Sequence, residues 1–284
     1  MTQKRTIIEL LIASVFWGLS FIAVRFALES FSPLYLTAFR FLGAFGVVLA
    51  FHLISAKRLI PHPTHQWKLS VLPGVLLGAT IVLQTAGLKF TSVSRSSFLT
   101  SLYVVFVPLI QILITRQPIS KNLLTAISVA LIGMALLCQT SLSGGWNIGD
   151  SLTLLCAVIA SVHILVIGRS AKIISSPFQF NALTSFFSGI IPLALAFWLE
   201  PPPSAITPSA VLGLLFLIGP ATLIAFAVQV RAQQTLSESV VSFFYLLEAP
   251  IASFFAYLIL SESLSLMQIL GAGLILVASK LALR

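Results

Sequence analysis

Two charged residues lie inside long apolar stretches of the sequence, where charges are least expected. Glu248 lies about ten residues into one stretch, and Pro250 follows two residues later. Arg40 lies seven residues after Pro33, in another stretch. Burial in an apolar medium favours the neutral form of a carboxyl group, and a guanidinium can hold a carboxylate through two parallel hydrogen bonds. Glu248 is therefore a candidate carrier of a coupling proton, and Arg40 a candidate for binding a substrate.

Both residues also have a structural interpretation. Glu248 could be an acid that is hydrogen-bonded to a neighbouring helix. Arg40 could extend to a membrane interface or cap loop carbonyls, because long cationic side chains reach toward water from apolar surroundings. The sequence alone leaves both interpretations open.

Six further polar or aromatic residues lie inside the apolar stretches. A tryptophan far from a membrane interface is either packed core or one wall of a cavity, and amide and phenol groups suit a site that binds and releases a solute. The same groups also form hydrogen bonds between membrane helices, and a lone histidine is more often a core residue. The six candidates for substrate binding are Trp17, Gln84, Tyr103, His163, Gln229 and Tyr245.

The composition requires membrane helices to position these residues. Of the 284 residues, 58% are hydrophobic and only 8% are charged, whereas a soluble domain has about 25% charged residues. The apolar stretches are long and continuous, unlike the alternating strands of a membrane β-barrel. About 20 helical residues span a hydrocarbon core of ~30 Å, so several stretches are full spans. The sequence predicts an all-α polytopic membrane protein and excludes a soluble domain, a disordered chain and a disulfide scaffold.

Prolines, glycines and serines divide the apolar stretches into ten predicted transmembrane helices. No connection exceeds about a dozen residues, which leaves no room for a soluble domain. The ten predicted helices cover residues 6–27, 33–55, 69–89, 96–115, 121–140, 151–169, 178–199, 209–230, 238–260 and 265–282.

The basic residues are distributed asymmetrically over the connections. The net charge is +9, and with a cytoplasmic N-terminus twelve of the sixteen lysines and arginines lie on the inner side. This is the positive-inside pattern, so we expect a protein of the cytoplasmic (inner) membrane with both termini in the cytoplasm. The basic excess orients the chain in the lipid bilayer and does not indicate nucleic-acid binding. The first apolar stretch lacks a small-residue cleavage site, so we expect it to be retained.

A shift of about 144 residues superimposes the two halves of the sequence. Matches of arginine, proline, glutamine and tyrosine are the most informative, because these residues are uncommon in so apolar a chain. They occur in the same order in both halves: Arg25 with Arg169, Pro33 with Pro177, Gln84 with Gln229, and Tyr103 with Tyr245. We expect two five-helix repeats, covering residues 1–142 and 148–284. Because five is odd, the second repeat enters the membrane from the opposite face. Such inverted repeats are typical of secondary transporters, whose substrate site lies near the midplane between the repeats.

Several short motifs occur together in an order typical of one transporter family. Residues 16–21 read FWGLSF, residues 91–99 read TSVSRSSFL, residues 247–250 read LEAP, and residues 260–262 read LSE. With Arg40 in the second predicted helix, these motifs resemble the EamA-type members of the drug/metabolite transporter superfamily. The resemblance covers nearly the whole chain. It implies ten helices and the export or exchange of small metabolites, often amino acids.

The sequence departs from this family pattern at two places. The first repeat has Gln117 where the family often places the acid that Glu262 represents in the second repeat. The sixth predicted helix has Ser161, Val162 and His163 instead of a second Trp-Gly pair. The resemblance does not identify the substrate, because this fold carries very different solutes.

The sequence therefore predicts a secondary transporter that exports or exchanges a small metabolite by alternating access through a central cavity. Amino acids or similar amphipathic solutes are the expected substrates. Proton coupling or solute exchange would supply the energy, because no phosphate-binding glycine loop is present. We expect no cofactor, and no metal, because His52, His62 and His65 lack cysteine or acidic partners at metal-ligand spacing. The sequence does not distinguish a monomer from a homodimer.

Two other classes of function are alternatives to transport. An intramembrane enzyme is not expected, because the sequence has no HExxH, no GxSxG and no paired intramembrane aspartates. A serine–histidine dyad that includes His163 is left open. A channel or receptor is also an alternative, although nothing resembles a selectivity filter and no soluble output domain is present.

Overall fold

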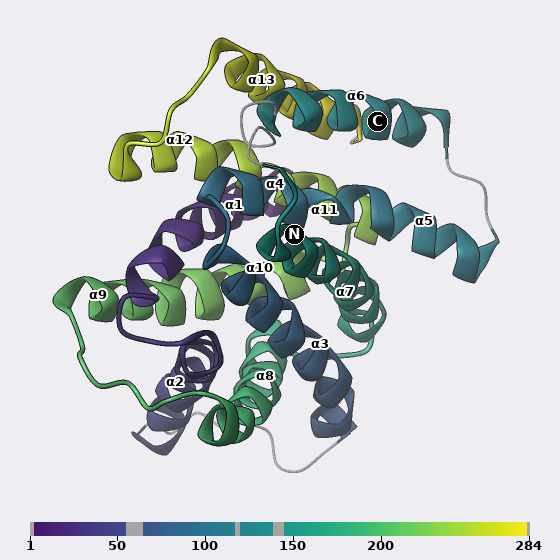
Figure 1. Cartoon of the computed structure of the whole chain (residues 1–284). Coiled ribbons are helices and arrows are strands. Elements are labelled where there is room, and N and C mark those ends of the chain that lie inside the picture. Colours follow the sequence, from purple (N-terminus) through teal and green to yellow (C-terminus); the bar gives the residue numbers. More distant parts are fainter. Residues whose placement is uncertain (1–2, 55–64, 117–119, 139–144, 283–284) are drawn as a thin grey trace.

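The computed structural model describes residues 3–54, 65–116, 120–138 and 145–282 of the chain (Figure 1). Within these ranges the chain is helical, with no strand. The helices of the first half are α1 (Gln3–Ala27), α2 (Pro33–Ile54), α3 (His65–Leu88), α4 (Val93–Ser101), α5 (Tyr103–Thr115) and α6 (Lys121–Cys138).

The second half repeats this order with one additional interruption. Its helices are α7 (Ile148–Ala171), α8 (Pro177–Leu199), α9 (Pro208–Ile218), the π-helical segment η1 (Gly219–Ile224), α10 (Ala225–Ala232), α11 (Glu238–Tyr245), α12 (Glu248–Leu260) and α13 (Leu266–Leu281).

The described helices are long and apolar enough for a multi-pass membrane protein. Eight helical units of 22 to 25 residues have the length and hydropathy to cross a membrane, and α6 and α13 contain two shorter apolar helices. Together they confirm the predicted order of ten helices in an all-α fold. The predicted end of the first repeat, residue 142, lies outside the described residues, so the extents 1–142 and 148–284 stay a prediction.

Short polar side chains begin seven of the described helices. In each case a hydroxyl or amide oxygen accepts a hydrogen bond from the backbone N–H three residues later, which a free helix N-terminus would otherwise leave unpaired. Proline follows the cap directly in α8 and α9, where its missing N–H removes no helical bond. The seven capping residues are Ser92, Ser120, Asn147, Ser176, Thr207, Ser237 and Ser265.

Three helices predicted to be continuous are interrupted in the structure. The predicted helix 96–115 divides into α4 and α5 at Leu102, and the predicted helix 238–260 divides into α11 and α12 at Leu246 and Leu247. The predicted helix 209–230 contains the π-helical segment. Hydropathy does not register the breaks at Leu102 and at Leu246 and Leu247, because leucine is as typical of a continuous apolar helix as of a break.

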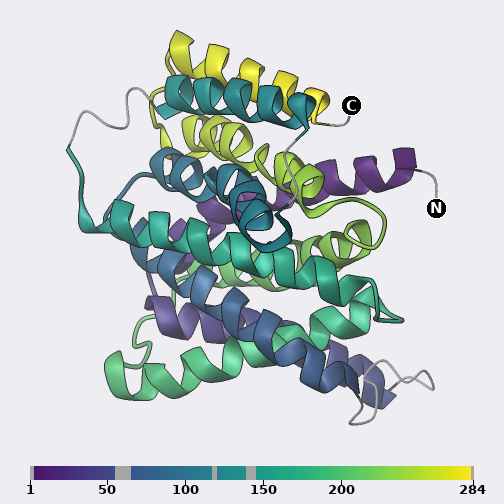
Figure 2. The same cartoon turned by 90° about the vertical axis from the view of Figure 1, so that its right-hand side faces the viewer.

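The first helix of each half packs against helices of the other half. α1, the first helix of the first repeat, packs against α9, α10 and α12 of the second. α7, the first helix of the second repeat, packs against α3, α4 and α5 of the first. Two other large contacts join equivalent helices, α2 with α8 and α6 with α13, at opposite ends of the molecule, and α3 also packs against α8 (Figure 1). These are the contacts of two inverted repeats related by an internal twofold axis. α1 begins and α13 ends on the same side (Figure 2).

Glycines allow the closest helix contacts in the fold. A Cβ atom on Gly74 or Gly78 would lie 2.8 Å or less from a backbone oxygen of α8, so these small residues let α3 and α8 pack closely. Gly133 of α6 and Gly271 of α13 face each other in the same way, because a Cβ atom on either would collide with the carbonyl oxygen of the other. The backbones of α6 and α13 therefore touch.

This contact predicts a difference between two neighbouring glycines of α13. Gly271→Ala places a methyl group against the Gly133 oxygen and 2.6 Å from the Leu137 nitrogen, whereas a Cβ atom on Gly273 meets nothing within 4 Å. We expect Gly271→Ala to destabilise the protein by about 1–3 kcal/mol, which is typical of overpacking. Thermal unfolding of the purified protein in detergent measures the effect. Gly273→Ala is the control, and equal melting temperatures for the two variants would contradict the contact.

Candidate functional site

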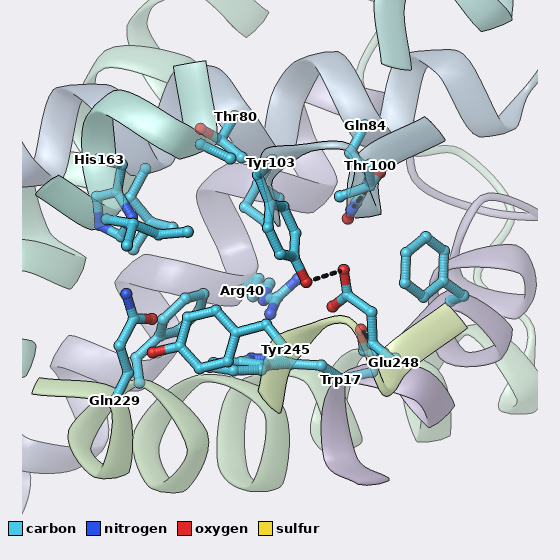
Figure 3. Close-up of a pocket in the computed structure, with 17 residues that line it drawn as sticks. Trp17, Arg40, Thr80, Gln84, Thr100, Tyr103, His163, Gln229, Tyr245 and Glu248 are labelled. Carbon is cyan, nitrogen blue, oxygen red and sulfur yellow. Dashed lines mark hydrogen bonds between the residues drawn. The ribbon is translucent and has the colours of Figure 1, made fainter. Parts of the chain in front are cut away.

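The eight predicted binding residues line a single cavity between the two repeats. The cavity has about 560 Å³ of space free of protein atoms, including its opening. Each residue is at least nine-tenths buried. The first repeat contributes Trp17, Arg40, Gln84 and Tyr103, and the second contributes His163, Gln229, Tyr245 and Glu248 (Figure 3). Their role in substrate binding stays a prediction.

Two helices that follow a break, α5 and α12, begin opposite each other in the cavity. Tyr103 is the first residue of α5, and Glu248 is the first residue of α12. The Tyr103 hydroxyl donates a hydrogen bond of 2.9 Å to Oε1 of Glu248 (Figure 3). Pro250 lies in the first turn of α12, and the Leu246 carbonyl that its missing N–H would leave unpaired accepts instead from the Ala249 N–H at 3.3 Å. The break thus leaves Glu248 free to face the cavity.

Arg40 is held in the cavity by oxygen atoms of the opposite repeat. Its Nε donates to Oγ1 of Thr222 at 2.7 Å, and its Nη2 donates to the Ala221 carbonyl at 3.3 Å. The guanidinium carbon lies 5.3 Å from the ring centre of Phe41 and 6.0 Å from that of Phe226. With 2% of its surface exposed, Arg40 does not extend to a membrane interface. In the described part of the chain it forms no ion pair with a carboxylate.

The π-helical segment supplies the acceptors for these contacts. In this segment the Ala225 N–H bonds to the Pro220 carbonyl, five residues back instead of the four of an α-helix. The Ala221 carbonyl accepts from Trp17 Nε1 at 3.2 Å as well as from Arg40. The Thr222 carbonyl accepts from Asn181 Nδ2 at 3.1 Å. Side chains of three other helices therefore dock onto one interruption.

Aromatic rings of both repeats form one wall of the cavity beside Arg40. The ring centres of Trp17 and Tyr245 are 4.7 Å apart in an edge-to-face contact, and those of Trp17 and Phe226 are 5.2 Å apart. Tyr103 and Tyr245, the predicted repeat-related pair, also meet edge to face at 6.3 Å. Trp17 thus belongs to a cavity wall as well as to the packed core.

The two predicted glutamines and the histidine have different partners. Gln84 donates to Oγ1 of Thr100 at 3.2 Å, and Gln229 donates to Oε1 of Gln233 at 3.4 Å. His163 packs edge to face against Phe226, with ring centres 6.5 Å apart. Its Nε2 is buried and has no hydrogen-bond partner in the described ranges. The serine–histidine hydrogen bond left open by the sequence is therefore not formed there.

Sequence reasoning missed several polar residues of the site. Ser20, Thr80 and Thr100 also line the cavity. Thr80 precedes Gln84 by one helical turn and Thr100 precedes Tyr103 by nearly one, so helical periodicity could have identified both. Thr222 and Asn181 had no comparable signal, because hydroxyl and amide groups are common in membrane helices as interhelical hydrogen bonds.

Comparison with known sequences places the chain in a family. Residues 4–139 and 147–284 each match the EamA-like transporter family, so the match covers almost the whole chain in two copies. The chain belongs to this family. It is accordingly a membrane transporter of the drug/metabolite transporter superfamily.

The relatives of this EamA-like protein agree with the assignment. An uncharacterized transporter of Archaeoglobus fulgidus is 29% identical over 95% of this chain and 82% of its own length. An uncharacterized transporter of Buchnera aphidicola subsp. Schizaphis graminum is 24% identical over 67% of this chain and 64% of its own length. A solved crystal structure has the same fold, with a TM-score of 0.78 over 99% of this chain and 97% of that one, at 17% identity.

Charged residues outside the cavity of this EamA-like protein pair at helix ends. Arg95, near the start of α4, forms a 2.5 Å ion pair with Asp150, near the start of α7, and both side chains are at most 5% exposed. Thr91 also donates to Asp150. Elsewhere Lys172 pairs with Glu238 at 3.5 Å, but the lysine side chain is 62% exposed. The first pair is desolvated and the second is largely solvated.

The two ion pairs predict different losses of stability. Asp150→Asn keeps the shape of the side chain but leaves the buried Arg95 without its counter-charge, which typically costs about 3–5 kcal/mol. Glu238→Gln breaks a longer pair whose lysine is exposed to solvent, so it should cost less than Asp150→Asn. Thermal unfolding in detergent compares the two variants with the native protein. Equal melting temperatures for the two would contradict the role of burial.

Proposed function

We propose that this protein is a secondary transporter that exports or exchanges a small zwitterionic metabolite by alternating access. Amino acids are the first substrate class to test. The observation that carries the proposal is the charge content of the cavity. One guanidinium and one carboxyl group line the same buried space, and neither forms an ion pair within the described residues.

Arg40 is the proposed partner of the substrate carboxylate. Its contacts with Thr222 and Ala221 use Nε and Nη2, and the described structure gives Nη1 no hydrogen-bond partner. Both of those acceptors are neutral, so the positive charge is not compensated by the protein. A carboxylate is the ligand that a guanidinium binds with the best geometry, because two parallel N–H donors match two oxygens.

Glu248 is the proposed partner of either the substrate ammonium group or a coupling proton. Tyr103 fixes Oε1 through its hydrogen bond, and Oε2 has no protein donor in the described ranges. A carboxyl group that is alternately bound to a cation and to a proton couples the two. Uptake of a proton as the ammonium group leaves would keep the Glu248 carboxylate itself neutralised in both states.

The arrangement of the repeats supports alternating access. α1 and α7 each pack against helices of the opposite repeat, and three of the helices that bound the cavity are interrupted beside it. Rocking one repeat against the other can move these contacts without breaking the helices elsewhere. The distribution of basic residues supports a cytoplasmic location for both termini, and α1 begins and α13 ends on the same side (Figure 2).

Counterflow in proteoliposomes tests the proposed function. Vesicles that contain the purified protein and an excess of unlabelled amino acid should accumulate the labelled amino acid transiently. A matched amine without the carboxylate and a matched acid without the ammonium group should compete at least about tenfold less well, because each loses one charged contact. Protein-free vesicles are the control. Absence of accelerated exchange with every zwitterion tried would contradict the proposal.

The pH dependence of exchange tests Glu248 separately. Glutamine has nearly the same shape as glutamate but cannot bind or release a proton, so Glu248→Gln should remove the pH dependence of transport between about pH 5 and 8. Glu238→Gln, which neutralises an acid outside the cavity, is the control and should keep it. Initial rates across this pH range provide the measurement. An unchanged pH profile in Glu248→Gln would rule out a proton-carrying role.

A further inference from the structure

A smaller side pocket adjoins the cavity between α3, α7, α8 and α10. It has about 190 Å³ of space free of protein atoms, including its opening. Cavity and side pocket share four lining residues, so the two spaces are contiguous: Leu77, His163, Phe226 and Gln229. The side pocket is lined in addition by Ile167, Asn181, Thr184 and Val230.

Two polar atoms of the side-pocket lining are buried without a partner. Nε2 of His163 and Oγ1 of Thr184 form no hydrogen bond with any described residue. Both residues are at least nine-tenths buried, with 4% and 2% of their surface exposed. A buried polar group without a partner costs about 1–3 kcal/mol, so folded proteins leave few of them. Two that line the same small pocket indicate a site for a group with hydrogen-bonding capacity.

The charge content of the lining restricts what that group can be. None of the eight residues that line the side pocket is aspartate, glutamate, lysine or arginine. A carboxylate or ammonium group would therefore be buried there without a counter-charge, which is far more costly than burying a neutral polar group. Four of the eight lining residues are apolar, and Asn181 and Gln229 are polar but neutral. A short neutral hydroxyl or amide group fits this chemistry.

The side pocket lies at the end of the cavity away from Glu248, because His163 and Gln229 line both spaces. Figure 3 shows Glu248 at one end of the cavity, His163 and Gln229 at the other end, and Arg40 between them. A zwitterion whose ammonium group faces Glu248 and whose carboxylate faces Arg40 directs its third substituent toward His163. At the repeat shift of 144 residues Arg40 corresponds to Thr184, so the duplicated position carries a charge in one copy and a hydroxyl in the other.

We propose that the side pocket is a specificity subsite, in which Thr184 and His163 bind the neutral hydroxyl or amide group of the substrate side chain. This inference rests on the proposed function and adds a selection among zwitterions. A site built to hydrogen-bond a hydroxyl group discriminates against the isostere that lacks it, because the polar atoms of the site then stay unpaired.

Threonine and valine are the probes, because they differ only by a hydroxyl in place of a methyl group. We expect L-threonine to compete for counterflow at least about fivefold better than L-valine, the factor that corresponds to one net hydrogen bond. Thr184→Val should reduce this ratio to within about twofold, because it removes the hydroxyl group that distinguishes the two substrates. Thr184→Ser should retain the preference, because it keeps the hydroxyl.

A matched control is available one residue further along α8. Ser185 also has a buried hydroxyl without a described partner, but it does not line the side pocket. Ser185→Ala should therefore leave the preference for threonine intact. Equal competition by threonine and valine in the native protein, or an unchanged ratio in Thr184→Val, would overturn the subsite but leave the proposed function standing. Absence of exchange with every amino acid would contradict both.

Discussion

A guanidinium buried among membrane helices must be satisfied by fixed oxygen atoms or by a counter-charge, and the central cavity is organised around this requirement. Arg40 has no described carboxylate partner, so its N–H groups depend on Thr222 and on the carbonyl of Ala221. Both acceptors belong to the π-helical segment, so the guanidinium is held by hydrogen bonds to that segment. The π-helical segment and the guanidinium therefore stabilise each other. Trp17 and Asn181 use carbonyls of the same segment, so they are tied to this arrangement as well.

The inverted duplication brings three helix interruptions to one place. Residues beside the breaks of both repeats reach the cavity, and the hydrogen bond from Tyr103 to Glu248 joins the first residues of α5 and α12. Within a membrane, interrupted helices are tolerated only where the freed backbone groups face protein or a polar cavity. Meeting at the interface of the repeats satisfies this condition for all three at once. It also places the polar groups of the site on the surfaces that alternating access would move.

The sequence predicted the spans and the cavity residues better than it predicted the backbone that holds them. Hydropathy locates a span because each window must match the bilayer thickness, and an intramembrane Arg40 or Glu248 is conspicuous because its burial is costly. The breaks at Leu102 and at Leu246 depend instead on which carbonyls find donors on other helices. That is a property of the packed state. The acceptor role of Thr222 was hidden for the same reason, since a hydroxyl in a helix can bond to its own backbone as readily as to a neighbour.

The duplication also explains why the site is not symmetric, although the fold is. Gln84 and Gln229 kept their side chains at equivalent positions, and so did Tyr103 and Tyr245. The position of Arg40 corresponds instead to Thr184, and Glu248 corresponds to Phe106 at the shift of 142 that aligns Tyr103 with Tyr245. Two arginines or two glutamates related by the axis would create like charges in one buried space, which is strongly unfavourable. One residue of each sign avoids this repulsion, and it also defines a direction across the cavity. Under the proposed function, a zwitterion would then bind in one orientation only, and its side chain would meet the neutral copy of the arginine position.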